Sequence, residues 1–144
     1  MSVFHDIDLY DQTILVVDDE PVNLKLLERI LSSEGYRHIV SISDPLQVLP
    51  AYKQHQPALI LLDLNMPVMN GFQVMEQLAG LKDLIAPPIV VLTAQSQQDS
   101  LLRALQQGAR DYVTKPFDRR ELLMRVRNFL DAHVAHRLVR HQKE

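Results

Sequence analysis

Three short apolar segments constrain the fold of this chain more than any other feature of its sequence. They are Thr13–Val17, Ala58–Leu62 and Ile89–Leu92. A strand with one face in water alternates apolar and polar residues, whereas a continuous apolar run indicates a strand buried on both faces. Ile39–Ile42 and the weaker Asp111–Thr114 bring the candidate strands to five. We therefore expect a parallel sheet covered by helices.

Helical patterns lie between these strands. The first ends at Gly35, a residue type that favours a helix C-terminus, and its apolar residues are Leu26, Leu27, Ile30 and Leu31. A second, over Gly71–Leu81, places on one side Phe72, Val74, Met75 and Leu78. A third, over Ser96–Gln107, is expected to direct inward Leu101, Leu102 and Leu105. Such alternation of strand and helix predicts a doubly wound α/β domain.

Two helical segments are less regular. Pro50 interrupts the pattern of Leu46, Val48, Leu49 and Tyr52, and proline inside a helix removes a backbone hydrogen bond, so we expect that helix to be short or kinked. The last segment would extend about 40 Å if it were helical throughout 118–144, since a helix rises ~1.5 Å per residue. Its apolar stripe, of the kind that packs against a partner helix, is Val126, Leu130, Val134 and Leu138. A frayed, exposed tail is the alternative.

Composition excludes several classes of protein. With 144 residues, 47% hydrophobic and 23% charged, the chain fits one globular domain and neither a disordered nor a fibrous protein. It has no cysteine, which excludes disulfides, thiolate zinc sites and a cysteine nucleophile. No apolar run approaches the ~20 residues of a membrane span, and the first residues lack the layout of a secretory signal. We expect a soluble cytoplasmic protein with no membrane partner.

Charge is distributed unevenly along the chain. Residues 1–117 carry a net charge of −6, and residues 118–144 carry +3. The acidic part offers no basic patch for a nucleic acid. Asp118, Glu121 and Asp131 interrupt the basic part, which is typical of a solvated helix face. We expect no direct binding to nucleic acid.

Polar residues that can carry chemistry stand where the candidate strands end. Asp18 and Asp19 follow the first strand, Asp63 the third, Thr93 the fourth, and Lys115 closes the fifth. In an open parallel sheet the carboxyl ends of the strands form one edge, and ligands bind in the crevice there. We therefore expect three carboxylates, a hydroxyl and an ammonium group to converge on one site.

The charges of this site indicate a metal ion. Two like charges 4 Å apart repel by ~4 kcal/mol at an effective dielectric of 20, so three carboxylates need cations beside them. Lys115 supplies one, and all-oxygen ligation favours Mg²⁺ over Zn²⁺ for the rest. Magnesium beside an ammonium group suits phosphoryl chemistry, in which Asp63 can accept the group as an acyl phosphate. Each residue alone has an ordinary explanation as a loop or capping residue; their joint occurrence at successive strand ends favours a functional site.

These residues resemble a known family. The matching motifs are Asp18-Asp19, Leu61-Leu62-Asp63-Leu64-Asn65-Met66-Pro67 with Asn70-Gly71, Leu92-Thr93-Ala94, and Tyr112-Val113-Thr114-Lys115-Pro116-Phe117. Over roughly residues 11–131 the chain resembles the receiver domain of bacterial two-component response regulators. The resemblance implies a flavodoxin-like, five-stranded parallel sheet of order 2-1-3-4-5, with helices on both faces and an extended C-terminal helix. We divide the chain into a lead-in (1–11), a receiver domain (12–131) and a helical linker or tail (132–144).

The resemblance also implies roles for the site residues. Asp63 would be phosphorylated by a histidine kinase or a phosphotransfer protein. Mg²⁺ would be bound by Asp18, Asp19, Asp63 and the backbone carbonyl of Asn65. Lys115 would pair with the phosphoryl oxygens.

A switch is part of the same expectation. Thr93 would donate its hydroxyl to the phosphoryl group, and Tyr112 would rotate into the space that Thr93 leaves. The face that moves would comprise the fourth helix, the fifth strand and the fifth helix. A homodimer that forms through this face, or through the last helix, is a hypothesis. The resemblance further implies a cis bond at Lys115-Pro116 and an influence of Asn65 and Gln95 on phosphoryl lifetime.

The output of such a switch is less defined. The segment from Arg125 to Leu130, running into a charged helix, is similar to receivers joined to an output domain. It is more similar to regulators that make or degrade cyclic dinucleotides than to those that bind DNA. Because Glu144 ends the chain without a helix stop signal, we expect a truncated chain.

The two rival functions are a phosphatase and a protein-binding scaffold. A phosphatase with an aspartyl nucleophile is expected to carry Asp-x-Asp after its first strand and a cap domain, whereas this chain has Asp18-Asp19-Glu20 and no room for a cap. A pseudo-receiver that only binds other proteins usually lacks the acceptor, the acid pair or the lysine, and this chain has all three. We therefore expect a regulatory phosphoacceptor rather than a turnover enzyme.

Overall fold

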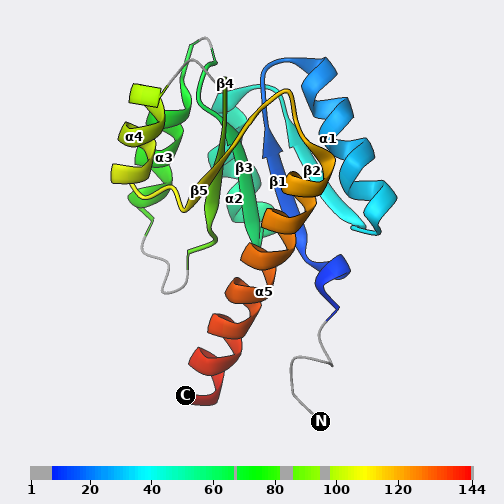
Figure 1. Cartoon of the computed structure of the whole chain (residues 1–144). Helices are drawn as coiled ribbons and strands as arrows, with labels where there is room; N and C mark the ends of the chain where they lie inside the picture. Colours follow the sequence, from blue (N-terminus) through cyan, green and yellow to red (C-terminus); the bar gives the residue numbers. More distant parts are fainter. Residues whose placement is uncertain (1–7, 67, 82–85, 95–97, 144) are drawn as a thin grey trace.

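In the computed structural model, five strands form one parallel sheet in the order β2-β1-β3-β4-β5 (Figure 1). The structure describes residues 8–66, 68–81, 86–94 and 98–143, with side chains as far as residue 136. The strands are β1 (Thr13–Val17), β2 (His38–Ile42), β3 (Leu59–Asp63), β4 (Ile89–Ala94) and β5 (Asp111–Lys115). The expected doubly wound sheet and its strand order are confirmed.

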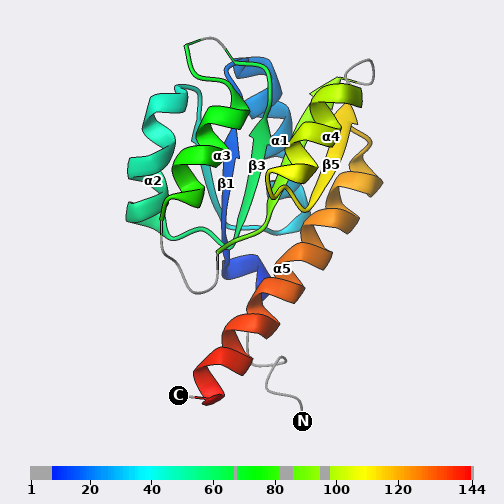
Figure 2. The same cartoon turned by 90° about the vertical axis from the view of Figure 1, so that its left-hand side faces the viewer.

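Helices cover both faces of this sheet (Figures 1 and 2). They are α1 (Pro21–Glu34), α2 (Val48–His55), α3 (Gly71–Ala79), α4 (Gln98–Gln106) and α5 (Arg119–Lys143), with short 3₁₀ turns η2 (Leu9–Asp11) and η3 (Pro45–Gln47). One buried cluster lies under α1 and α5, and a second lies under α2, α3 and α4. None of the helices in the described residues is long and apolar enough to cross a membrane.

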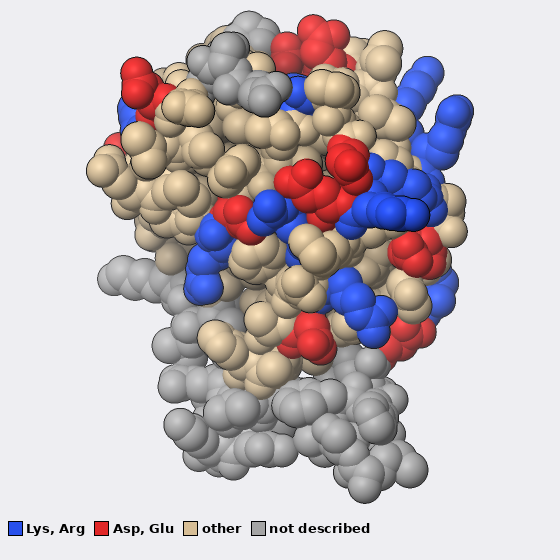
Figure 3. Space-filling model, in the orientation of Figure 1, with Lys and Arg blue, Asp and Glu red and all other residues tan. Residues whose placement is uncertain are grey.

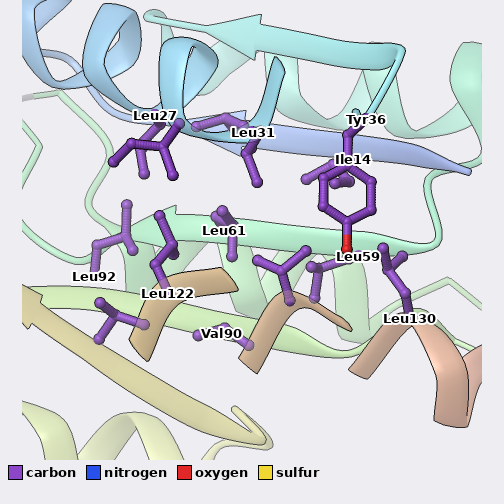
Figure 4. Packing of buried hydrophobic residues seen from close by; sticks show 14 of the residues in the cluster. Ile14, Leu27, Leu31, Tyr36, Leu59, Leu61, Val90, Leu92, Leu122 and Leu130 are labelled. Atoms are coloured by element: carbon purple, nitrogen blue, oxygen red, sulfur yellow. The ribbon is translucent and has the colours of Figure 1, made fainter. Parts of the chain in front are cut away.

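Leucines of three elements contribute to the cluster under α1 and α5 (Figure 4). Leu27 and Leu31 of α1 meet Leu61 of β3, and Leu122 and Leu130 of α5 reach the same cluster. All five side chains are fully buried. Burial of a leucine contributes about 1.5–3 kcal/mol, so the first half of α5 is firmly attached to the sheet.

On the opposite face of the sheet, the prediction for α3 is confirmed and part of the prediction for α4 is wrong. In α3 the four apolar residues Phe72, Val74, Met75 and Leu78 are buried, as predicted. In α4, however, Leu102 and Leu105 are 59% and 37% exposed, so the expectation that they point inward is wrong. The buried residue of α4 is Ala104, whose small side chain lets the helix lie close to the second cluster. Leu26 of α1 is likewise exposed.

The helix containing Pro50 is short, as expected. Residues Pro45–Gln47 form η3 instead of a first helical turn, and the carboxylate of Asp44 accepts the N–H of Leu46 at its start. Because α2 begins only at Val48, Pro50 lies within its first turn, where the missing N–H has no partner inside the helix.

The two ends of the described chain lie below the sheet in Figure 1. At the N-terminal end, the ring of Tyr10 packs on Tyr36 with 4.9 Å between centroids, and the carbonyl of Tyr10 accepts the N–H of Arg37 at 3.0 Å. The C-terminal half of α5 continues past the sheet (Figure 1). In the stripe proposed for a partner helix, Val134 is buried within the chain, and the side chain of Leu138 lies outside the described residues.

Candidate functional site

The carboxyl edge of the sheet collects the polar residues that the sequence singled out. Asp18 follows β1 directly, Asp63 and Lys115 are the last residues of β3 and β5, and Thr93 is the last but one of β4. The candidate third, fourth and fifth strands ended one or two residues earlier, whereas the first ended at Val17 as observed. Parallel pairing holds these positions in register, since Asp63 lies opposite Leu92. Asp63, Thr93 and Lys115 are therefore held by sheet backbone, whereas Asp18 and Asp19 lie in the loop that follows β1.

Three carboxylates meet at this edge. One oxygen from each of Asp18, Asp19 and Asp63 lies within 4.8 Å of the others. Asp18 and Asp63 are 0% and 2% exposed, and Asp19 is partly exposed. The Oδ1 of Asp18 accepts the N–H of Glu20 at 2.9 Å, but its buried Oδ2 has no hydrogen bond among the described residues. A buried carboxylate oxygen without a hydrogen bond is costly, and the Lys115 ammonium beside it offsets part of that cost.

Lys115 supplies part of the compensating charge. Its Nζ lies 3.2 Å from Asp18 Oδ2 and 3.3 Å from Asp63 Oδ1. One ammonium group cannot balance three carboxylates, so the cluster retains a negative charge. A divalent cation with oxygen ligands would balance it, and both the charge and the oxygen donors fit Mg²⁺.

The pKa of Asp63 reflects this surplus of negative charge. Burial and then the neighbouring charge of Asp18 raise the pKa of Asp63 to about 6. The Lys115 ammonium and the N–H of Asn65, which donates to Asp63 Oδ1 at 3.2 Å, act in the opposite direction. Asp63 is thus a buried carboxyl group whose ionised form needs a further cation.

The remaining site residues lie nearby, with one exception. Thr93 is buried, and its hydroxyl donates a long hydrogen bond of 3.3 Å to the carbonyl of Ala94. The peptide bond Lys115-Pro116 is cis, as expected. Gln95 lies outside the described residues. Because the hydrogen bond from Thr93 to Ala94 is long, the Thr93 hydroxyl is weakly held.

Tyr112 is flanked by a charged network that the sequence reasoning missed. The guanidinium of Arg125 lies 5.7 Å from the centroid of the Tyr112 ring, and it pairs with Asp111 and Glu121. Acidic and basic residues are interleaved over this face of the molecule (Figure 3). Glu121 and Arg125 lie four residues apart, a spacing that allows an ion pair on a helix, so this part of the network could be predicted from the sequence.

Comparison with known proteins agrees with the fold and the site. A family model described as the response regulator receiver domain matches residues 14–127. The DNA-binding response regulator MtrA of Mycolicibacterium smegmatis is 42% identical over 120 residues, which cover 83% of this chain and 51% of that protein. The transcriptional regulatory protein KdpE of Mycobacterium tuberculosis is 40% identical over 114 residues, covering 79% of this chain and 49% of that protein.

A solved structure extends the comparison. The receiver domain of the sensor histidine kinase PA1611 from Pseudomonas aeruginosa superposes with a TM-score of 0.75 at 32% identity, covering 83% of this chain and 98% of that one. It was solved with a magnesium ion coordinated in its active-site cleft. This chain spans about half the length of MtrA and KdpE. Those two relatives are named as transcriptional or DNA-binding regulators, whereas the sequence of the last helix favoured a cyclic-dinucleotide output. The family match covers most of the chain, and we conclude that the chain belongs to the response regulator receiver domain family.

Proposed function

We propose that this chain is the phosphoacceptor of a two-component system and takes a phosphoryl group on Asp63 from a histidine kinase or a phosphotransfer protein. One observation carries the proposal. The Asp63 carboxylate is buried at the carboxyl edge of the sheet, with the Lys115 ammonium 3.3 Å away and two further carboxylates beside it. Membership of the receiver family supports the same chemistry.

In this proposal a carboxylate oxygen of Asp63 attacks the phosphorus, and the bond from phosphorus to the donor group breaks as the acyl phosphate forms. Lys115 pairs with the phosphoryl oxygens, and the Thr93 hydroxyl donates to one of them. Asp18, Asp19, Asp63 and the carbonyl of Asn65 would hold Mg²⁺, which would offset the charge of the phosphoryl group. The cluster of three carboxylates, which the single Lys115 ammonium does not balance, supports this ligand set.

The proposed switch follows from the added charge. Phosphorylation adds about −1.5 to −2 charges at Asp63 and draws the Thr93 hydroxyl away from its long bond to Ala94. The Tyr112 ring then turns inward and leaves Arg125, which alters the face formed by α4, β5 and α5. Residues 12–131 act as the receiver, residues 132–144 as a helical linker or tail, and the altered face acts on an output domain, a partner or a second copy of the chain.

Acetyl phosphate with Mg²⁺ offers a direct test. Intact-protein mass should increase by one phosphoryl group in the wild type and in the control Asp131→Asn, which changes an exposed aspartate of α5. Asp63→Asn should gain none. A gain in Asp63→Asn, or none in the wild type while another receiver is modified in parallel, would contradict the proposal. Turnover of p-nitrophenyl phosphate would favour a phosphatase instead.

A further inference from the structure

The geometry points to Gly71, the first residue of α3, as a positioning residue that fixes the backbone of Asp63 and the residues after it. This inference rests on the proposed function of Asp63. A Cβ atom at position 71 would lie 2.6 Å from the carbonyl oxygen of Asp63 and 2.8 Å from the Cα of Leu64. Both neighbours are backbone atoms, so no side-chain rotation relieves the contact. The absence of a side chain at Gly71 is what lets α3 start directly against the acceptor strand.

Hydrogen bonds join the same two segments. The N–H of Gly71 donates to the carbonyl of Leu64 at 3.1 Å, and the N–H of Leu64 donates to the carbonyl of Leu92 in β4 at 3.3 Å. The loop from Asn65 to Asn70 is therefore closed at its base by Gly71 and Leu64. Asn65, the proposed carbonyl ligand, is the first residue of that loop. Its position depends on how closely the base is held.

Neither side of this contact is free to move away. On the α3 side, the side chain of Asn70 accepts the N–H of Gln73, and the side chain of Gln73 accepts the N–H of Asn70. On the β3 side, Leu64 is 1% exposed and packed in the second cluster. A side chain at position 71 must therefore displace the backbone next to Asp63, and with it Asn65.

The chain offers a matched control. Gly80, at the other end of α3, would place its Cβ 3.4 Å from the nearest atom, which is ordinary contact, and its φ of −72° suits alanine. Gly71→Ala and Gly80→Ala thus make the same chemical change at the two ends of one helix. Only the first pushes on the acceptor backbone.

The test compares these two variants in the metal-free protein and with Mg²⁺. Amide NMR shifts of Asp63, Leu64 and Asn65 should move without metal in Gly71→Ala, while those of Ile14 to Val17 in β1 should not. Mg²⁺ titration by calorimetry should give about 10-fold to 100-fold weaker binding, as for loss of a residue that orients metal ligands. Gly80→Ala does not push on the acceptor backbone, so it should bind Mg²⁺ within about twofold of the wild type.

Equal Mg²⁺ affinity and unmoved amide shifts in a folded Gly71→Ala would overturn the inference. Should that variant fail to fold, Asn70→Ala decides, because it removes the cap of α3 without adding a side chain at position 71. We expect Asn70→Ala to weaken Mg²⁺ binding several-fold, and unchanged binding would count against Gly71. Since these readouts require no phosphoryl transfer, failure of the wild type to accept phosphate would refute the function of Asp63 separately.

Discussion

Helices α3 and α4 cover the same face of the sheet and have the same length of nine residues, yet they are attached very differently. The buried residues of α3 are Gly71, Phe72, Val74, Met75 and Leu78. In α4, Ala104 is the buried residue within the described part. Burial of apolar area is the main force that holds a helix against a sheet. We therefore expect α3 to be held firmly beside Asp63 and α4 to shift more easily when the site changes.

A contact between a cation and an aromatic ring joins the two helices. The guanidinium of Arg103 in α4 lies 4.1 Å from the centroid of the Phe72 ring in α3. A cation over an aromatic ring contributes about 0.5–1 kcal/mol where it is exposed to water. Such a contact can hold α4 in place in the resting state and still be released at little cost.

The largest effect should come from truncating a buried side chain of α3. Met75→Ala removes a side chain that is 3% exposed within the second cluster and should lower the free energy of unfolding by about 2–5 kcal/mol. Urea unfolding monitored by circular dichroism measures this. A loss below about 1 kcal/mol would mean that α3 is not the anchored helix of the pair.

The buried acceptor beside α3 should itself reduce stability when no metal is bound. Because the folded pKa of Asp63 is raised from 3.8 to about 6, its ionisation disfavours the folded state, and this loss appears as pH rises through the folded pKa. Asp63→Asn should therefore stabilise the metal-free protein by about 1–3 kcal/mol near pH 8 and by little near pH 4. Urea unfolding at both pH values, with a chelator present, tests this; a gain that does not vary with pH would be inconsistent with it.

Removing the contact between the two helices should have a smaller and local effect. Arg103→Met keeps the length of the side chain but removes its charge, and we expect a loss of about 0.5–1 kcal/mol. Hydrogen exchange should accelerate for amides of α4 and stay unchanged for those of α3. Equal acceleration in both helices would show that they open as one unit.

The smallest effect should come from the exposed surface of α4. Leu102, 59% exposed, should tolerate Leu102→Ala within about 0.5 kcal/mol, measured in the same urea series as Met75→Ala. A large loss would show that α4 is packed more tightly than its exposed leucines indicate.

The same pair of helices shows what could be predicted from the sequence. Apolar runs locate the strands because burial on both faces leaves few alternatives, and the order of polar residues at the strand ends predicted which side chains come together. The inward face of α4 was predicted only in part: Leu101 packs against the second cluster as expected, but leucine spacing does not reveal that the small Ala104 faces the sheet in place of Leu102 and Leu105. The contacts of Arg103 and the close approach at Gly71 depend on tertiary distances that no local pattern encodes.

Identification of the modified residue tests the central claim most directly. Borohydride reduces an aspartyl phosphate to homoserine, which peptide mass spectrometry locates in the chain. After treatment with acetyl phosphate and Mg²⁺ followed by borohydride, homoserine should appear at position 63 and nowhere else. Homoserine at position 18 or 19, or a phosphorylated protein with none at position 63, would contradict the assignment of Asp63 as the phosphoacceptor.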